Sequence, residues 1–262
     1  MAKYYGGCDL GSTTGKAVIL SDGKVVSTAL IRSRIDPTET GQEVLAKACE
    51  KIPGLSGLDG LTYLVGTGYG RNEVPFANEN TSEITCHAVG AHFCDKEVRT
   101  IVDIGGQDIK AIAVNDDGSV LEFAMNDKCA AGTGRFYEAV VRTFDLSLDE
   151  FSDLSLKAKK VIPVTSQCTV FAETEIVSLL YKRNPPADIA AGIQMSVAKR
   201  VFTMARRVGV RPKITVTGGC SKNRGLVKML GKTLRTDVVA LNFDPQLMGA
   251  LGAAVLASRK GG

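Results

Sequence analysis

A repeated octapeptide constrains what this chain can fold into. Asp9-Leu10-Gly11-Ser12-Thr13-Thr14-Gly15-Lys16 recurs 94 residues later as Asp103-Ile104-Gly105-Gly106-Gln107-Asp108-Ile109-Lys110, with Asp, an apolar residue, Gly and Lys at the same offsets. Each copy follows a short apolar segment and leads into another, before a turn that contains Asp22-Gly23 or Asp117-Gly118. This order predicts strand, Gly-rich turn, strand, hairpin and strand in both places. The repetition therefore predicts two homologous lobes.

The segments outside the repeats predict further helices and strands. Apolar spacing and capping residues predict helices over 43–52, 82–93, 134–144, about 168–182, 187–208, 223–234 and 245–258. Short apolar runs predict strands over 61–65, 213–217 and 238–241. We expect an N-terminal lobe over 1–98 and a C-terminal lobe over 99–262, with the final helix 245–258 packing back on the N-terminal lobe.

Composition narrows the class of protein. The 262 residues are 44% hydrophobic and 23% charged, with a formal net charge of +4 spread along the chain. These values are ordinary for a globular protein, and they mark no basic patch for nucleic acid or a membrane surface. The N-terminus lacks the apolar core of a signal peptide, and no run approaches the ~20 apolar residues of a membrane span. We expect a cytoplasmic protein that binds neither nucleic acid nor membrane.

The cysteines limit the metal chemistry that one chain can support. They stand at positions 8, 49, 86, 94, 129, 168 and 220, without a CxxC pair. Cytoplasmic thiols are kept reduced, so a disulfide framework is not expected. The missing CxxC pair weighs against a zinc ribbon, and it excludes the clustered cysteines with which a ferredoxin chain wraps a whole iron–sulfur cluster. A cluster here would need ligands from distant positions or from two chains.

The two repeated turns favour a nucleotide. Turns rich in Gly, Ser and Thr let backbone N–H groups and hydroxyls approach phosphate oxygens, and an Asp at the preceding strand end is well placed to hold Mg²⁺ through water. A third segment, 214–223, runs from a strand into Gly218-Gly219 and a helix start. Its glycines would admit an adenine or ribose, although alone they would fit a tight strand-to-helix turn equally well.

In this order the three motifs resemble the phosphate-1, phosphate-2 and adenosine motifs of the actin, hexokinase and sugar-kinase ATPase superfamily. The resemblance covers nearly the whole chain. It implies an α/β fold of two similar lobes, each with a mixed five-stranded sheet flanked by helices, which close over ATP. Kinases, chaperones and filaments share this frame, so the fold alone does not decide the function.

Two cysteine-containing segments, 126–136 and 166–173, narrow the resemblance. They are similar to stretches of the BadF/BadG/BcrA/BcrD ATPase family, and most closely to those of activators of 2-hydroxyacyl-CoA dehydratases. In that family each subunit supplies two cysteines, and a homodimer shares one 4Fe–4S cluster. The resemblance assigns Cys129 and Cys168 as the ligands.

The residues agree with this assignment. Both cysteines lie just before or at the start of a predicted helix, where N–H groups and the helix dipole stabilise a thiolate. A cubane needs four thiolates, which two copies related by a two-fold axis would supply. The remaining five cysteines are interpreted as buried thiols. His87 and His92 are interpreted as helix-surface or capping residues.

The resemblance implies an ATPase that passes one electron at a time to an iron–sulfur 2-hydroxyacyl-CoA dehydratase, with ferredoxin or flavodoxin as the donor. It implies that Asp9 and Asp103 hold Mg²⁺ and that Gln107 or Asp103 orients the attacking water. The implied nucleotide contacts are Gly11, Ser12, Thr13, Thr14, Gly15, Lys16, Gly105, Gly106, Lys110, Gly218, Gly219, Lys222 and Gln246.

Three alternatives stay open at this point. An ATPase subunit of a benzoyl-CoA reductase, or the activator of a double-cubane protein, would use the same cysteines. A small-molecule kinase would need a catalytic Asp and a sugar pocket, and would leave Cys129 and Cys168 without a role. A non-catalytic filament or scaffold protein would not need intact nucleotide motifs.

Overall fold

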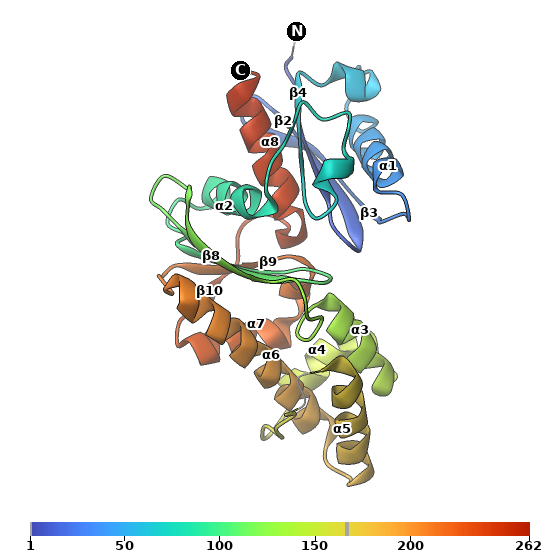
Figure 1. Ribbon diagram of the computed structural model, residues 1–262, viewed down its shortest axis with the longest axis vertical. Coiled ribbons are helices and arrows are strands. Elements are labelled where there is room, and N and C mark those ends of the chain that lie inside the picture. Colours follow the sequence, from blue (N-terminus) through green and yellow to red (C-terminus); the bar gives the residue numbers. More distant parts are fainter. Residues whose placement is uncertain (1, 166–167) are drawn as a thin grey trace. The chain divides into compact units, whose positions relative to one another are not determined.

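The computed structural model describes residues 2–165 and 168–262 (Figure 1). The chain forms two compact units. The first unit comprises residues up to Val98 together with Val114–Leu121 and Leu241–Gly262, and the second comprises Arg99–Ala113 and Glu122–Ala240. The sequence-based division placed the C-terminal segment in the second lobe, with its final helix packing back on the first. In the structure, Leu241–Gly262 groups with the first unit.

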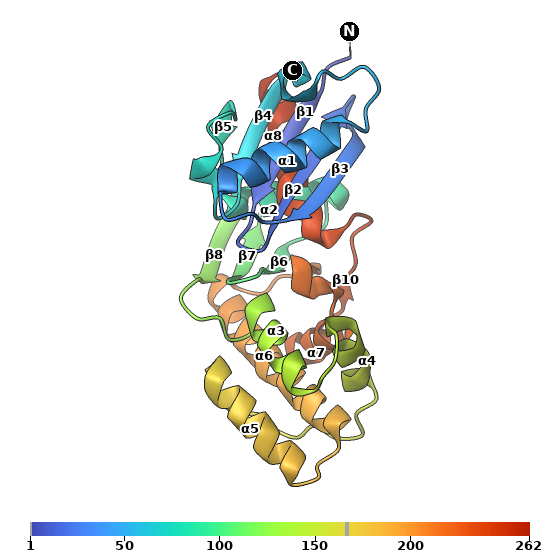
Figure 2. The same cartoon turned by 90° about the vertical axis from the view of Figure 1, so that its right-hand side faces the viewer.

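The first unit is built on a five-stranded mixed sheet in the order β3-β2-β1-β4-β5. Its strands are β1 (Tyr5–Leu10), β2 (Thr14–Ser21), β3 (Lys24–Arg32), β4 (Tyr63–Thr67) and β5 (Glu79–Asn80). β1 pairs antiparallel with β2 and parallel with β4. Helix α1 (Pro37–Cys49) covers one face of the sheet, and α8 (Met248–Lys260), which also packs on α2 (Glu83–Cys94), covers the other (Figures 1 and 2).

The second unit repeats this sheet in the order β10-β9-β6-β7-β8. Its strands are β6 (Thr100–Ile104), β7 (Ile109–Val114), β8 (Val120–Asn126), β9 (Ile214–Thr217) and β10 (Val238–Val239). Here β6 takes the place of β1, because it pairs antiparallel with β7 and parallel with β9. The helices are α3 (Gly134–Thr143), α4 (Leu148–Leu156), α5 (Thr169–Tyr181), α6 (Pro186–Val208) and α7 (Arg224–Leu234). The predicted pair of mixed sheets flanked by helices is confirmed.

Local capping signals explain where the helices begin. They account for one helix start that the apolar spacing misplaced and for one helix that it missed. α1 starts at Pro37 rather than at 43, because the Asp36 carboxylate accepts from the N–H of Thr38 at 2.8 Å and proline suits the first helical turn. α4 was not predicted, although Ser147 and Glu150 form a capping box at its start. β10 is two residues long, shorter than predicted.

The interpretation of the two histidines as surface or capping residues was wrong. His87 and His92 are 5% and 6% exposed, because their helix α2 packs against α8 of the same unit. The buried-thiol interpretation is correct for Cys8, Cys49 and Cys86, whereas Cys94 and Cys220 are half-buried. Within the described residues, no helix is both long enough and apolar enough to cross a membrane.

Candidate nucleotide and cysteine sites

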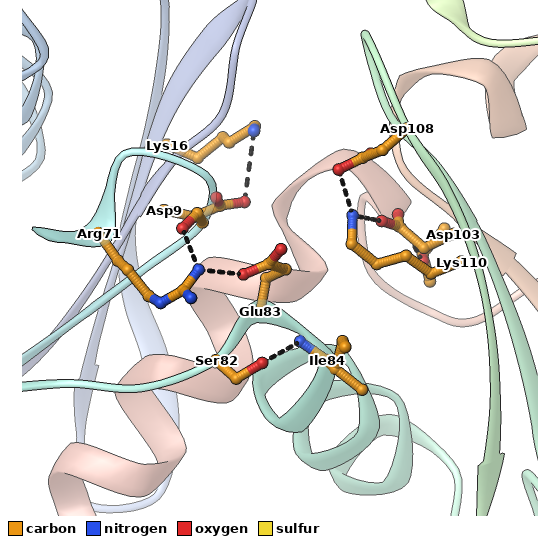
Figure 3. Close-up of polar contacts among 11 residues, drawn as sticks. Asp9, Lys16, Arg71, Ser82, Glu83, Ile84, Asp103, Asp108 and Lys110 are labelled. Carbon is orange, nitrogen blue, oxygen red and sulfur yellow. Dashed lines mark hydrogen bonds and ion pairs between the residues drawn. The ribbon is translucent and has the colours of Figure 1, made fainter. Parts of the chain in front are cut away.

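The Asp9 turn lies at the end of β1, where the sheet register places Asp9 opposite Lys16 of β2. The Lys16 Nζ lies 3.3 Å from the Asp9 carboxylate, and both side chains are largely buried (Figure 3). The turn between the strands holds Gly11, Ser12 and Thr13, and it is closed by the N–H of Gly11, which donates to the Thr14 carbonyl at 3.0 Å. The predicted phosphate-binding residues therefore form one tight hairpin.

Two further charged residues join this hairpin, and the sequence reasoning missed both. Arg71, just after β4, points toward the Asp9 carboxylate and pairs with Glu83 at 2.8 Å (Figure 3). Glu83 is fixed in the first turn of α2, whose N-terminus is capped by Ser82. The signal that could have found Arg71 is the Gly68-Tyr69-Gly70-Arg71 stretch, which follows a strand directly.

His87 also belongs to the surroundings of Asp9. A Cβ on Gly249 of α8 would lie 2.8 Å from an Asp9 oxygen and 3.1 Å from His87 Nε2. Both groups thus converge on one glycine, and a larger residue there would push them apart. This convergence depends on α8 and could not be read from the neighbourhood of Asp9 in the sequence.

The Asp103 turn repeats the arrangement in the second unit. Asp103 of β6 lies opposite Lys110 of β7, and the two groups are 3.3 Å apart (Figure 3). The N–H of Gly105 donates to the Asp108 carbonyl at 3.0 Å, so the hairpin that carries Gly106 and Gln107 closes as the first does. Lys110 is also 2.7 Å from the Asp108 carboxylate. The buried Lys110 ammonium therefore lies against two carboxylates, Asp103 and Asp108, whereas Lys16 lies against the Asp9 carboxylate.

The Gly218 segment adjoins Asp103. β9 pairs with β6 so that Thr217 lies opposite Asp103, and the Thr217 hydroxyl donates to the Asp103 carboxylate at 3.0 Å. Gly218 has a φ of +81°, and a Cβ there would lie 2.4 Å from the Ile104 carbonyl oxygen. Only glycine suits this position. A short 3-10 helix, Gly219–Lys222, follows it, with Lys222 exposed.

Gln246, the last predicted nucleotide contact, belongs to the first unit, unlike the Gly218 segment. It sits in the 3-10 helix Pro245–Leu247 of the first unit, where its N–H donates to the Asp244 carboxylate at 2.9 Å. The predicted contacts are thus divided, with the Asp9 hairpin and Gln246 in the first unit and the Asp103 hairpin and the Gly218 segment in the second.

Cys129 lies in the loop before α3, a helix whose first residues are bonded to the Asp103 turn. The N–H groups of Gly134 and Arg135, the first two residues of α3, donate to the carbonyls of Gly105 and Gly106, each at 2.9 Å. Cys129 lies in the loop just before α3, which begins at Gly134 as predicted. Its sulfur accepts from the Arg200 guanidinium of α6 at 3.7 Å.

Cys168 is the N-cap residue of α5 and is exposed, as a ligand shared with another molecule would need to be. The preceding residues of its predicted segment, 166 and 167, lie outside the described residues. Exposed apolar side chains follow Cys168 on α5 and precede Cys129 on β8: Val170, Phe171, Val177, Tyr181, Leu121, Phe123 and Met125.

The other cysteines have less reactive thiols. Burial raises the pKa of Cys86 and of Cys220 to about 12 each and that of Cys94 to about 11, and it raises the pKa of Cys8 as well. Since the thiolate is the nucleophile and the metal ligand, these four thiols are poor in both roles near neutral pH. In the part of the chain that the structure describes, no three His, Cys, Asp or Glu side chains gather into a metal site.

Comparison with known proteins identifies the family of this chain. The model of the BadF/BadG/BcrA/BcrD ATPase family matches residues 7–257. The chain belongs to this family. Among relatives of this family, the activator of lactoyl-CoA dehydratase of Anaerotignum propionicum is 43% identical over 256 residues, which cover 97% of each chain.

Solved structures of family members agree with this chain over almost their full length. The (R)-2-hydroxyglutaryl-CoA dehydratase component A of Acidaminococcus fermentans superposes with a TM-score of 0.93 at 38% identity, covering 99% of both chains. The activator of the 2-hydroxyisocaproyl-CoA dehydratase from Clostridium difficile, solved with bound ADPNP, gives 0.91 at 39% identity and covers 100% of this chain and 96% of its own. A glucokinase of Streptomyces griseus, 12% identical with a TM-score of 0.63, shows the shared fold alone. The predicted sugar-kinase-like ATPase fold is thereby confirmed.

Proposed function

We propose that the chain is an ATP-hydrolysing activator that donates single electrons to an iron–sulfur 2-hydroxyacyl-CoA dehydratase. One observation carries the proposal: helix α3, whose preceding loop carries Cys129, is hydrogen-bonded through the N–H groups of Gly134 and Arg135 to the predicted phosphate turn at Gly105 and Gly106. The relatives named as dehydratase activators support the same function.

Cys129 and Cys168 fit a thiolate-ligated 4Fe–4S cluster shared by a homodimer. One thiol is exposed at a helix N-terminus, and the other lies beside an arginine cation, so both surroundings favour negative charge. Four thiolates from two copies complete the ligand set, and the cluster, when bound, supplies a one-electron carrier. Exposed apolar side chains stand on α5, which follows Cys168, and on β8, which precedes Cys129 in the chain, and we expect a second copy to cover them.

The two hairpins and the Gly218 segment are assigned to MgATP. Ser12, Thr13 and Thr14 supply hydroxyls, and Lys16 supplies a cation that already lies against a carboxylate. Asp9 and Asp103 hold the Mg²⁺ through water, as that ion prefers. Gln107 or Asp103 orients the attacking water. The remaining assigned contacts are Gly11, Gly15, Gly105, Gly106, Lys110, Gly218, Gly219, Lys222 and Gln246.

The bonds between the second turn and α3 supply a route from nucleotide to cysteine. The carbonyls of Gly105 and Gly106 accept from the N-terminal N–H groups of α3, whose preceding loop carries Cys129. A phosphate that reorients these peptides would shift the start of α3 and the loop with it. ATP would then act as a conformational gate on electron delivery. We assign the donor as ferredoxin or flavodoxin and the location as the cytoplasm, where thiols stay reduced.

Iron content tests the proposal. Cys129→Ser and Cys168→Ser each remove two of the four thiolates of a symmetric dimer, so each variant should lose its cluster. The measurement is iron per dimer and the visible absorption spectrum of anaerobically purified protein. Cys49→Ser and Cys94→Ser are matched controls and should keep the metal. A colourless, iron-free wild-type dimer that phosphorylates a sugar would replace the proposal with a kinase.

A further inference from the structure

Arg200 is the charged residue that the structure places on the Cys129 sulfur. Its Nη1 donates to Sγ at 3.7 Å, although the two residues are 71 positions apart in the sequence. This distance is normal for a hydrogen bond to sulfur, which is larger than oxygen. No sequence motif relates the two residues, and Arg200 is not among the site residues assigned above.

Packing holds the arginine and the cysteine loop against each other. A Cβ on Gly132, which lies in that loop, would meet Val197 at 3.4 Å and the Arg200 side-chain stem at 3.5 Å. Val197 and Val201 on either side of Arg200 are buried, which anchors this turn of α6 in the core of the second unit. Arg200 itself is half-buried. Water therefore screens its charge less than it would on an open surface.

A cation beside a ligand sulfur changes the reduction potential of the cluster that the sulfur binds. Adding an electron makes a thiolate-ligated cluster more negative, and hydrogen bonds to the sulfurs and nearby charge are two of the protein's means of setting its potential. The guanidinium therefore interacts more favourably with the reduced state than with the oxidised state. In a two-fold dimer this effect is doubled, because each copy brings its own Arg200 to its own Cys129.

We propose that Arg200 is a positioning residue that holds the Cys129 sulfur and makes the shared cluster easier to reduce. This inference rests on the proposed function. The electron comes from the low-potential one-electron donor protein and leaves to the dehydratase, and no proton or covalent bond is exchanged. Arg200 thus keeps the potential within reach of the donor.

The experiment is a redox titration of anaerobically reconstituted full-length dimers, followed by the electron paramagnetic resonance signal of the reduced state. Arg200→Gln should shift the midpoint potential to a more negative value. Arg200→Lys keeps the charge but not the planar donor fork, so its potential should lie between those of Arg200→Gln and wild type. Lys199→Gln removes the same charge from the neighbouring exposed position and should leave the potential unchanged.

The outcomes separate this inference from the proposed function. An Arg200→Gln dimer with a full cluster and the wild-type potential overturns the role of Arg200 and leaves the activator function intact. An equal shift in Lys199→Gln also overturns it, since general charge rather than the sulfur contact would then be responsible. If Arg200→Gln loses its cluster, the Arg200→Lys potential decides by the same comparison. A wild-type dimer without iron refutes the proposed function itself.

Discussion

The Asp9 and Asp103 turns began as the same hairpin and now have different neighbours. Both place Lys opposite Asp at 3.3 Å, and both close with a 3.0 Å bond from the glycine N–H to the carbonyl of the third residue after it, Thr14 or Asp108. In the first unit the Gly11 carbonyl accepts from the Ser33 hydroxyl at 2.9 Å. In the second unit the equivalent Gly105 carbonyl accepts from the α3 backbone at 2.9 Å.

This difference gives the turns different consequences. A hydroxyl on a loop can follow a small movement of the turn without moving a helix. A backbone N–H at the start of α3 cannot, since the helix is held by its own hydrogen bonds and moves as one body. We therefore expect a change at the second turn to reach α3 and the Cys129 loop, whereas a change at the first turn would be passed to Ser33 and Gly70, which are bonded to it and lie outside helices. The repeat gives the chain two similar turns, and among the described residues only the second is bonded to α3, the helix that follows Cys129.

The largest expected effect tests the charge difference between the turns. Lys110→Met leaves the buried Asp103 carboxylate and the half-buried Asp108 carboxylate without the ammonium that lies against both, which should cost about 3–5 kcal/mol of unfolding free energy. Lys16→Met should cost less, about 1–3 kcal/mol, because Arg71 points toward the carboxylate that remains. The measurement is urea unfolding of both variants. Equal losses would remove the distinction between the two lysines.

Asp103→Ala should have the next largest effect, on turnover. Phosphoryl transfer depends on metal and positioning, so the rate of ATP hydrolysis should fall by about 100-fold or more. Cys129 and Cys168 are untouched, so iron content should stay at the wild-type value. Cluster oxidation after addition of MgATP and dehydratase then shows whether hydrolysis is needed for transfer. Wild-type oxidation in a variant that binds but does not hydrolyse ATP would make binding the trigger.

The smallest expected effect comes from exchanging Thr14 and Asp108, which occupy the same position in the two turns. Asp108 occupies the position of Thr14 in the repeat. Asp108→Thr removes a negative charge beside the phosphate turn and frees Lys110 from one carboxylate, so MgATP should bind about two- to fivefold more tightly, equivalent to roughly 0.5–1 kcal/mol. Thr14→Asp should weaken binding by a similar factor. Nucleotide titration calorimetry measures both, and changes of the same sign would contradict the electrostatic explanation.

Local chemistry allowed much of this to be predicted. The repeat itself carries the register that sets Asp9 opposite Lys16 and Asp103 opposite Lys110, because a two-residue side-chain period across a short turn leaves little freedom. Residues that arrive from distant elements could not be found in this way. Arg71, Arg200 and the burial of His87 depend on β4, α6 and α8, whose positions follow from packing and not from neighbouring sequence.

α8 has a consequence for the order in which the protein is made. Residues 1–98 of the first unit leave the ribosome before any residue of the second, yet the sheet and α2 that they form are covered by a helix that is synthesised after every residue of the second unit. Nascent domains generally fold from the N-terminus onward, as complete units. Here that order is reversed: the second unit can finish while the first waits with an apolar face exposed. A chaperone that shields nascent chains would therefore be needed most for the N-terminal half.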